Sequence, residues 1–272
     1  MNNLNGPIGL FDSGVGGLTV ARAIARRLPN ERIIYFGDTA HLPYGEKSPE
    51  AIKSFSLKIS NHLIKNGAKA IVIACNSASS VGFEYLESKL SVPVFNVIDP
   101  LIEELKKVKS SGIGVWGTRA TINSKVYATK LKKALPETYV HCVPTPLLVP
   151  LIEENHLSGE IIDSVIQYYL KKSNINHLEH LVLACTHYPL ISTQISKHLN
   201  AKVTLMRTPN IVADSIAIKL KERGLLQKEK NYFNHDFSVS DYTDTFKKIS
   251  QVFFGDGIQL KENNIWASTN GI

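Results

Sequence analysis

The sequence is poor in cysteine: it has three in 272 residues and no Cys-x-x-Cys pair. Three thiols cannot all pair in disulfides, and without closely spaced cysteines a structural zinc site is not expected. No apolar run approaches the length of about 20 residues that spans a bilayer. The N-terminus also lacks a basic region followed by an apolar signal core. We therefore expect a cytoplasmic protein with free thiols, no bound metal and no membrane contact.

Long basic clusters are missing too, although the net charge is +7. Lysines occur as scattered pairs such as Lys106-Lys107, Lys132-Lys133 and Lys171-Lys172, which are typical of solvated helix faces. There is no zinc-finger or RNP-like string and no Walker GxxxxGK[ST] motif. The sequence argues against nucleic acid as a partner, and solubility with a general attraction for anions explains the charge.

Apolar runs alternate with amphipathic stretches along the chain, which predicts βαβ units and an α/β fold. The length of 272 residues is at or beyond the size where one core usually divides into two. The expected buried strands are Ile8–Phe11, Ile33–Phe36, Ala70–Ala74, Val92–Val97, Gly112–Trp116, Val140–Val143, Leu181–Ala184 and Val203–Met206. The expected helices are Leu18–Leu28, Glu50–Asn66, Pro100–Lys109, Thr121–Leu135, Glu160–Lys172 and Ile211–Arg223.

The two halves of the chain resemble each other. AIVIACNSASS begins at Ala70 and LVLACTHYPL at Leu181, while IGLFDSG and IGVWGTR form a second matched pair upstream. Asp12 precedes Cys75 by 63 residues, and Thr118 precedes Cys185 by 67. We predict two similar doubly wound parallel-sheet domains related by a pseudo-twofold axis, with an active site between them.

The repeat also predicts the domain boundaries. The first domain is expected to comprise residues 1–98 together with 209–272, and the second residues 99–208. The last strong helix is expected to pack back on the first domain, and the tail 255–272 to be peripheral. Three prolines between Pro144 and Pro150 predict a shaped loop that enters a helix near Leu151.

Polar clusters fall at the carboxyl ends of the expected strands, where ligands bind in open α/β sheets. They are Asp12-Ser13-Gly14, Gly37-Asp38-Thr39 leading to Pro43-Tyr44-Gly45, Cys75-Asn76-Ser77, Gly117-Thr118 and Cys185-Thr186-His187. The glycine-rich run after Asp12 is consistent with a plain tight turn, or with backbone N–H groups that hold an anion such as a carboxylate. It matches a dinucleotide-binding fingerprint only weakly.

Cys75 and Cys185 each precede an expected helix N-terminus, which favours the thiolate and predicts a lowered pKa. Such a thiol can remove a proton near neutral pH. Either cysteine alone is compatible with a small buried hydrophobe, but their pairing by the repeat favours an acid and a base on opposite sides of one atom. Cys142 has no counterpart and is expected to be a core residue of its strand.

The neighbours of the two cysteines are short donors. Asn76, Ser77 and Thr186 can cap the following helices or bind a carboxylate or ammonium group. His187 can support Cys185 as a thiolate or form a hydrogen bond in the core. Glu153, taken alone, is consistent with an ordinary surface carboxylate.

These motifs resemble those of the cofactor-independent aspartate/glutamate racemase superfamily. The matching strings are GLFDSGVGGLTV, GDTAHLPYG, ACNSAS, IGVWGTRATINS, PLIEE and ACTHYPL. They occur in the family order from Ile8 to Leu190, with matching flanks to about Gly255. DSGVGG, PYG and CTHYP together favour glutamate over aspartate or hydantoin substrates.

The resemblance implies roles for individual residues. Cys75 would deprotonate D-glutamate and Cys185 L-glutamate, with the other thiol returning a proton from the far side. Asp12, Glu153 and His187 would assist proton transfer or bind the ammonium group. The residues expected to contact substrate are Asp12, Ser13, Tyr44, Gly45, Asn76, Ser77, Thr118, Thr186 and His187.

The resemblance further implies no cofactor, a homodimer, and a product, D-glutamate, that is used in peptidoglycan synthesis. Ser77 stands where threonine is common, which keeps the hydroxyl group. Two other hypotheses are an aspartate racemase, and a protein- or nucleic-acid-binding module that keeps an enzyme fold. Turnover of aspartate but not glutamate would favour the first, and salt-sensitive DNA binding the second.

Overall fold

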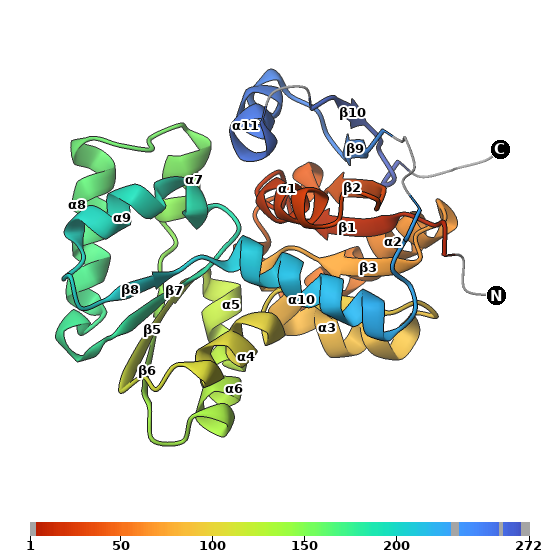
Figure 1. Cartoon of the computed structure of the whole chain (residues 1–272). Helices are drawn as coiled ribbons and strands as arrows, with labels where there is room; N and C mark the ends of the chain where they lie inside the picture. Colours follow the sequence, from red (N-terminus) through yellow and green to blue (C-terminus); the bar gives the residue numbers. More distant parts are fainter. Residues whose placement is uncertain (1–3, 230–233, 256–257, 268–272) are drawn as a thin grey trace.

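The computed structural model describes residues 4–229, 234–255 and 258–267, which form two parallel β-sheets with helices packed around them (Figure 1). The larger sheet has six strands in the order β10-β9-β2-β1-β3-β4. Its strands are β1 (Ile8–Asp12), β2 (Ile33–Gly37), β3 (Ala70–Ile73), β4 (Val94–Asn96), β9 (Asp236–Val239) and β10 (Leu260–Glu262).

The smaller sheet has four strands in the order β6-β5-β7-β8, and all of its pairings are parallel. Its strands are β5 (Gly112–Gly117), β6 (Tyr139–Pro144), β7 (His180–Ala184) and β8 (Thr204–Met206). The order β2-β1-β3-β4 in the larger sheet matches β6-β5-β7-β8 in the smaller one. The prediction of two similar parallel-sheet α/β units is therefore confirmed, and β1 and β5 occupy equivalent positions.

Helices surround both sheets (Figure 1). Beside the larger sheet lie α1 (Leu18–Arg27), α2 (Pro49–Lys65), α3 (Asn76–Lys89), α4 (Asp99–Lys107), α10 (Thr208–Glu222) and α11 (Asp244–Phe254). With the smaller sheet are α5 (Arg119–Asn123), α6 (Val126–Ala134), α7 (Leu148–Glu153), α8 (Glu160–Lys172) and α9 (Ser192–His198). Short 3-10 turns are η1 (Thr39–His41), η2 (Tyr44–Glu46), η3 (Ile175–His177) and η4 (Tyr188–Ile191). None of the helices in the described ranges combines the length and the apolar composition needed to cross a membrane.

Strands β1, β2 and β3 of the larger sheet are buried on both faces, which explains why they are continuous, mostly apolar runs. Successive residues point to opposite faces: Leu10 and Val72 join one apolar cluster, while Phe11 and Ile73 join the other, against α2 and α3. The first cluster continues without a break into the smaller sheet, because α10 returns from that sheet and packs on α1. The two halves thus share one hydrophobic core.

Several elements differ from the sequence-based expectations. The single helix expected over Thr121–Leu135 is interrupted between α5 and α6, where Lys125 adopts a left-handed conformation (φ 59°). Cys142 is half-buried rather than a core residue, because β6 is an edge strand. Helix α11 and strands β9 and β10 were not among the expected elements. Helix α3 begins directly after Cys75, as expected, and α7 begins close to the expected start near Leu151, whereas the α-helix after Cys185, α9, begins only at Ser192. The strand β10 belongs to the tail expected to be peripheral, and it does lie at the sheet edge.

A buried ion pair lies near the amino ends of β2 and β3, the ends that are farther from the cysteines. Lys69 Nζ lies 2.6 Å from Glu31 Oε2, and both side chains are almost fully buried. Lys69 Nζ also donates to the carbonyl of Leu4, and Glu31 Oε1 accepts from the backbone N–H of Gln227. Four segments distant in sequence therefore meet at this pair.

We expect Glu31→Gln to lower the free energy of unfolding by about 3–5 kcal/mol, because it leaves the Lys69 ammonium buried without its counter-charge. Urea unfolding is the measurement. Glu103→Gln, which breaks the exposed Glu103–Lys106 pair, is the control and should cost less than about 1 kcal/mol. The double variant Glu31→Gln/Lys69→Met should recover much of the loss; equal losses for the buried and exposed pairs would contradict this account.

Candidate active site

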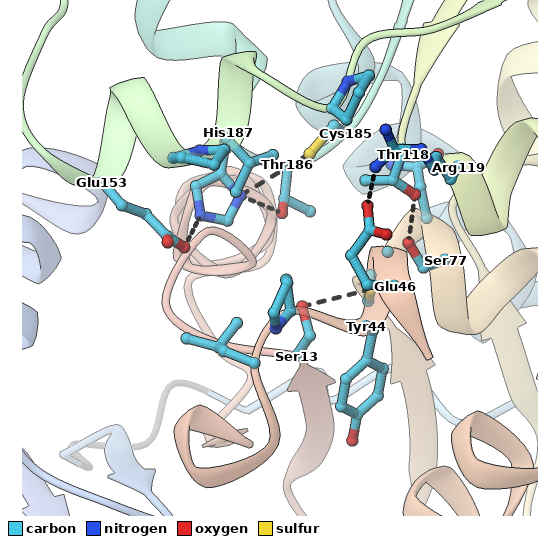
Figure 2. A pocket seen from close by; sticks show the side chains of 18 of the residues that line it. Ser13, Tyr44, Glu46, Ser77, Thr118, Arg119, Glu153, Cys185, Thr186 and His187 are labelled. Carbon is cyan, nitrogen blue, oxygen red and sulfur yellow. Dashed lines mark hydrogen bonds and ion pairs between the residues drawn. The ribbon is translucent and has the colours of Figure 1, made fainter. Parts of the chain in front are cut away.

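The carboxyl ends of both sheets border one cavity of about 300 Å³. This volume is at the lower end of the roughly 300–1,000 Å³ typical of small-molecule pockets. From the first half it is lined by Ser13, Tyr44, Gly45, Cys75, Asn76 and Ser77, and from the second by Thr118, Glu153, Cys185, Thr186 and His187. Figure 2 shows side chains from both halves meeting there. The structure therefore brings together all the residues expected at the site except Asp12, which lies outside the lining.

Asp12 is fully buried at the end of β1. Its Oδ2 accepts a hydrogen bond from the Gly17 backbone N–H at 2.8 Å, and its Oδ1 has no hydrogen-bond partner among the described residues. Burial raises the pKa of Asp12, against the opposing effects of the His187 charge and of backbone N–H groups. The glycine-rich turn thus donates a backbone hydrogen bond to the chain's own carboxyl group.

Two glycines allow the halves to approach closely. A Cβ at Gly16 would lie 2.6 Å from both Thr186 Oγ1 and His187 Nδ1. At Gly45 it would lie 2.8 Å from the Thr118 Cβ. Both distances are shorter than Cβ contacts in proteins, so these positions need glycine because of space across the interface between the halves.

Cys75 is the N-cap residue of α3 and is buried below the cavity surface. Its Sγ accepts from the Ala78 backbone N–H at 3.5 Å and donates to Ser13 Oγ at 3.7 Å. Burial, followed by the charge of Asp12, raises the pKa of Cys75 to about 12. The expected lowering of the Cys75 pKa is therefore wrong, because the loss of hydration on burial outweighs the effect of the helix N-terminus.

Cys185 has a different environment. No α-helix follows it directly, contrary to the expectation; the 3-10 turn η4 begins at Tyr188. Its Sγ lies 3.8 Å from His187 Nδ1, and His187 Nε2 donates to Glu153 Oε1 at 3.0 Å. Burial alone would lower the pKa of His187, but the hydrogen bonds and charges of Cys185 and Glu153 raise it to about 10. Cys185, His187 and Glu153 thus form a connected line at the cavity (Figure 2).

Neutral donors cover the wall between the two cysteines. Ser77 Oγ lies 2.8 Å from Thr118 Oγ1, and Thr121 Oγ1 is within 3.4 Å of both hydroxyls. Asn76 Oδ1 accepts from the buried Tyr127 hydroxyl at 2.7 Å. Hydroxyl and amide groups of this kind can bind carboxylates.

Some residues that line the cavity were not among the site residues expected from the sequence. Arg119 Nη1 lies 2.7 Å from Glu46 Oε1, so an ion pair joins the two halves at the cavity (Figure 2). Pro146, Leu147 and Val149 come from the proline-rich segment, which was recognised as a shaped loop but not as part of the site. Among the described residues, no cluster of three or more histidine, cysteine or acidic side chains is placed to hold a metal.

The fold and the site define a class: α/β proteins with two matched parallel sheets that each contribute one cysteine to a shared cavity. The family model for Asp/Glu/Hydantoin racemase matches residues 15–216. The chain belongs to this family.

Known relatives cover nearly the whole chain. A glutamate racemase from Geobacter metallireducens is 41% identical over 249 residues, which are 91% of this chain and 92% of that protein. The crystal structure of a Francisella tularensis glutamate racemase in complex with D-glutamate has a TM-score of 0.89 at 36% identity, covering 96% and 98% of the two chains. A Bacillus anthracis glutamate racemase isoform has a TM-score of 0.91 at 33% identity, covering 97% and 99%. A Picrophilus torridus aspartate racemase, at 18% identity and a TM-score of 0.58, shares the fold.

We expect Glu153→Gln to lower the pKa of His187 below its value of about 10, because the variant removes one charged hydrogen-bond acceptor. Imidazole NMR measures this titration. Since the folded-state pKa lies above the unfolded value of about 6.5, His187 contributes stability that is fully present below about pH 6.5 and is lost as pH rises through about 10. Glu154→Gln changes an exposed neighbouring carboxylate and should leave the titration unchanged; an unchanged pKa in Glu153→Gln would contradict the assigned cause.

Asp12→Asn should speed the alkylation of Cys75 by iodoacetamide at pH 9, because it removes a negative charge that raises the pKa of Cys75. The thiolate is the reacting form, so each unit of pKa lowering increases the rate about tenfold. Mass spectrometry of the separate peptides gives the rates, with Cys142 as the internal reference. A Cys75 rate that stays the same relative to Cys142 would refute the proposed influence of Asp12.

Proposed function

We propose that this chain interconverts L-glutamate and D-glutamate by proton transfer at the α-carbon, with Cys75 and Cys185 as the two acid/base groups. The observation that carries the proposal is that each matched half supplies one buried cysteine to the same cavity. An acid and a base from opposite walls can exchange the α-proton without turning the substrate over. The reaction needs no cofactor, because the two thiols account for both proton transfers.

In the proposed reaction, one thiolate takes the α-proton and the opposite thiol delivers a proton to the other face of the α-carbon. Cys185 takes the proton from L-glutamate, and Cys75 takes it from D-glutamate. The raised pKa of Cys75 favours the thiol, which is the form that delivers a proton when D-glutamate is made. On the other side, the raised pKa of His187 keeps a proton on the imidazole beside Cys185 Sγ. Asp12 near Cys75, and Glu153 on the side of Cys185, are proposed to assist proton transfer or to bind the substrate ammonium group.

The substrate carboxylates are proposed to bind neutral donors. These are the side chains of Ser13, Asn76, Ser77, Thr118 and Thr186, together with the backbone of Tyr44 and Gly45. The Tyr44 hydroxyl donates to Asp38, so we assign substrate contact to the backbone of this residue. Fixed donors around a closed cavity stabilise the charge that develops when the weakly acidic α-proton leaves. Glutamate is favoured over aspartate because the relatives at 33–41% identity are glutamate racemases.

Three further assignments accompany the proposal. The product D-glutamate would be used in peptidoglycan synthesis, and the working enzyme would be a homodimer. The domains would be residues 1–98 with 209–272, and residues 99–208. Support for this division comes from the pairing of β9 with β2 and the packing of α10 on α1.

The first experiment is circular dichroism of the purified protein with D-glutamate in heavy water, without added cofactor. Decay of the signal with deuterium at the α-position would support racemisation by proton exchange. Turnover of aspartate but not glutamate would favour the aspartate racemase hypothesis. No turnover of either substrate would overturn the proposal.

Cys75→Ala and Cys185→Ala should each reduce racemisation by at least about a hundredfold, because each removes one acid/base group. Cys185→Ala should still exchange the α-hydrogen of D-glutamate without inversion, and Cys75→Ala that of L-glutamate, because each variant keeps the one thiol that acts on that enantiomer. Mass spectrometry and chiral chromatography distinguish exchange from inversion. Cys142→Ala is the matched control and should keep full activity. Inversion at the normal rate with either site cysteine absent would refute the two-thiol mechanism.

A further inference from the structure

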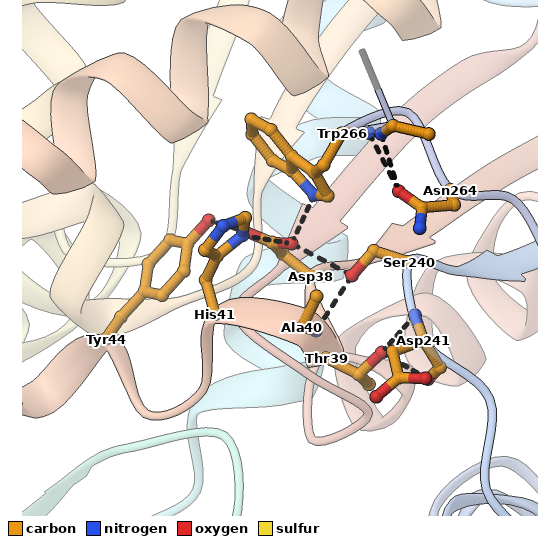
Figure 3. Close-up of polar contacts among 10 residues, drawn as sticks. Asp38, Thr39, Ala40, His41, Tyr44, Ser240, Asp241, Asn264 and Trp266 are labelled. Carbon is orange, nitrogen blue, oxygen red and sulfur yellow. Dashed lines mark hydrogen bonds and ion pairs between the residues drawn. The ribbon is translucent and has the colours of Figure 1, made fainter.

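Asp38 is a fully buried carboxylate outside the cavity lining, and four side chains donate hydrogen bonds to it (Figure 3). Their distances are 2.6 Å from the Tyr44 hydroxyl, 2.7 Å from Trp266 Nε1, 2.9 Å from Ser240 Oγ and 3.0 Å from His41 Nδ1. All four partners are donors, which is the set that an ionised carboxylate accepts. Asp38 directly follows β2, so the sheet fixes its position.

The four donors come from two parts of the chain. His41 and Tyr44 belong to the loop after β2, whereas Ser240 and Trp266 lie about 200 residues later. Aromatic packing reinforces the connection: the His41 ring stacks on Phe55 with centroids 4.2 Å apart and meets the Trp266 ring edge-on at 4.5 Å. The C-terminal segment is therefore fastened to this loop through one buried carboxylate.

The same loop forms part of the cavity wall. The Tyr44 hydroxyl binds Asp38 (Figure 3), and the ring is directed away from the cavity (Figure 2). The next residue, Gly45, is in close contact with Thr118 of the other half. A shift of Tyr44 would therefore change the cavity and its contact with the second half.

We propose that Asp38 is a positioning residue of the substrate site, and that Trp266 is a second positioning residue that acts through its hydrogen bond to Asp38. Together they hold the Tyr44–Gly45 wall in the conformation that binds substrate. Neither residue lines the cavity, so both act on substrate binding through Tyr44. The kinetic part of this proposal rests on the proposed glutamate racemisation.

The test compares two substitutions of the same kind. Trp266→Phe removes the indole donor to Asp38 but keeps an aromatic ring. Trp116→Phe removes another indole hydrogen bond of 2.7 Å, to Ser173 in the second half. We expect Trp266→Phe to raise the KM for glutamate roughly three- to tenfold with kcat within about twofold, because a hydrogen bond to a charged group is lost. Trp116→Phe should leave KM unchanged, even if it lowers stability.

Asp38→Asn is the second variant, because it keeps the shape and replaces one acceptor oxygen with a donor group. Its KM should rise at least about tenfold. Hydrogen exchange of the ligand-free proteins provides a readout independent of turnover. Amides of residues 39–47 should exchange faster in Trp266→Phe and Asp38→Asn than in the wild type, and not in Trp116→Phe.

The outcomes separate the two proposals. An unchanged KM in both Asp38→Asn and Trp266→Phe, or an equal rise in Trp116→Phe, would overturn the positioning role. A wild-type protein inactive on glutamate would refute the proposed function instead. In that case the exchange of residues 39–47 would still decide whether Asp38 and Trp266 hold the loop.

Discussion

The site depends on the close approach of two parallel sheets whose carboxyl edges share one cavity. Polar groups at strand ends are usually solvated, whereas here each sheet edge shields the polar side chains of the other edge from water. Glycine at positions 16 and 45 provides the space for this approach, and the shared hydrophobic core holds the halves together behind it. This mutual burial raises the pKa of Asp12 and of Cys75, because the charged form of each group has lost water.

Each half has a cysteine after an equivalent strand, Cys75 after β3 and Cys185 after β7, but the neighbouring side chains differ. Cys75 is near the carboxylate of Asp12, which raises the pKa of Cys75 further above the value set by burial. Cys185 contacts His187, whose own pKa is raised and which binds Glu153. The two matched halves thus place an acidic side chain beside one cysteine and a basic side chain beside the other.

The sequence predicted strands β1 to β8. The signal is strongest for β1, β3, β5 and β7 in the middle of the two sheets, because strands buried on both faces are continuous apolar runs. The sequence also predicted most of the polar residues that line the cavity, because these residues lie both in the internal repeat and at the carboxyl ends of strands. It did not predict β9, in which the buried Phe237 and Val239 alternate with more exposed residues. The predicted direction of the Cys75 pKa shift was wrong. Burial raises this pKa, and burial against the second half of the chain leaves no local pattern in the sequence around Cys75. The partners of Asp38 and the Glu46–Arg119 pair depend on tertiary contacts between distant segments, which spacing alone cannot reveal.

The pairing of β9 with β2 has a consequence for the order of synthesis. All strands of the smaller sheet have been synthesised once residue 206 is made, whereas β9 begins at Asp236. The sheet that begins first is therefore completed last, and during translation β2 remains an open edge. An unpaired edge strand is a template for wrong pairing with another chain. For this protein, the late C-terminal segment acts as the intramolecular cover that ends this exposure.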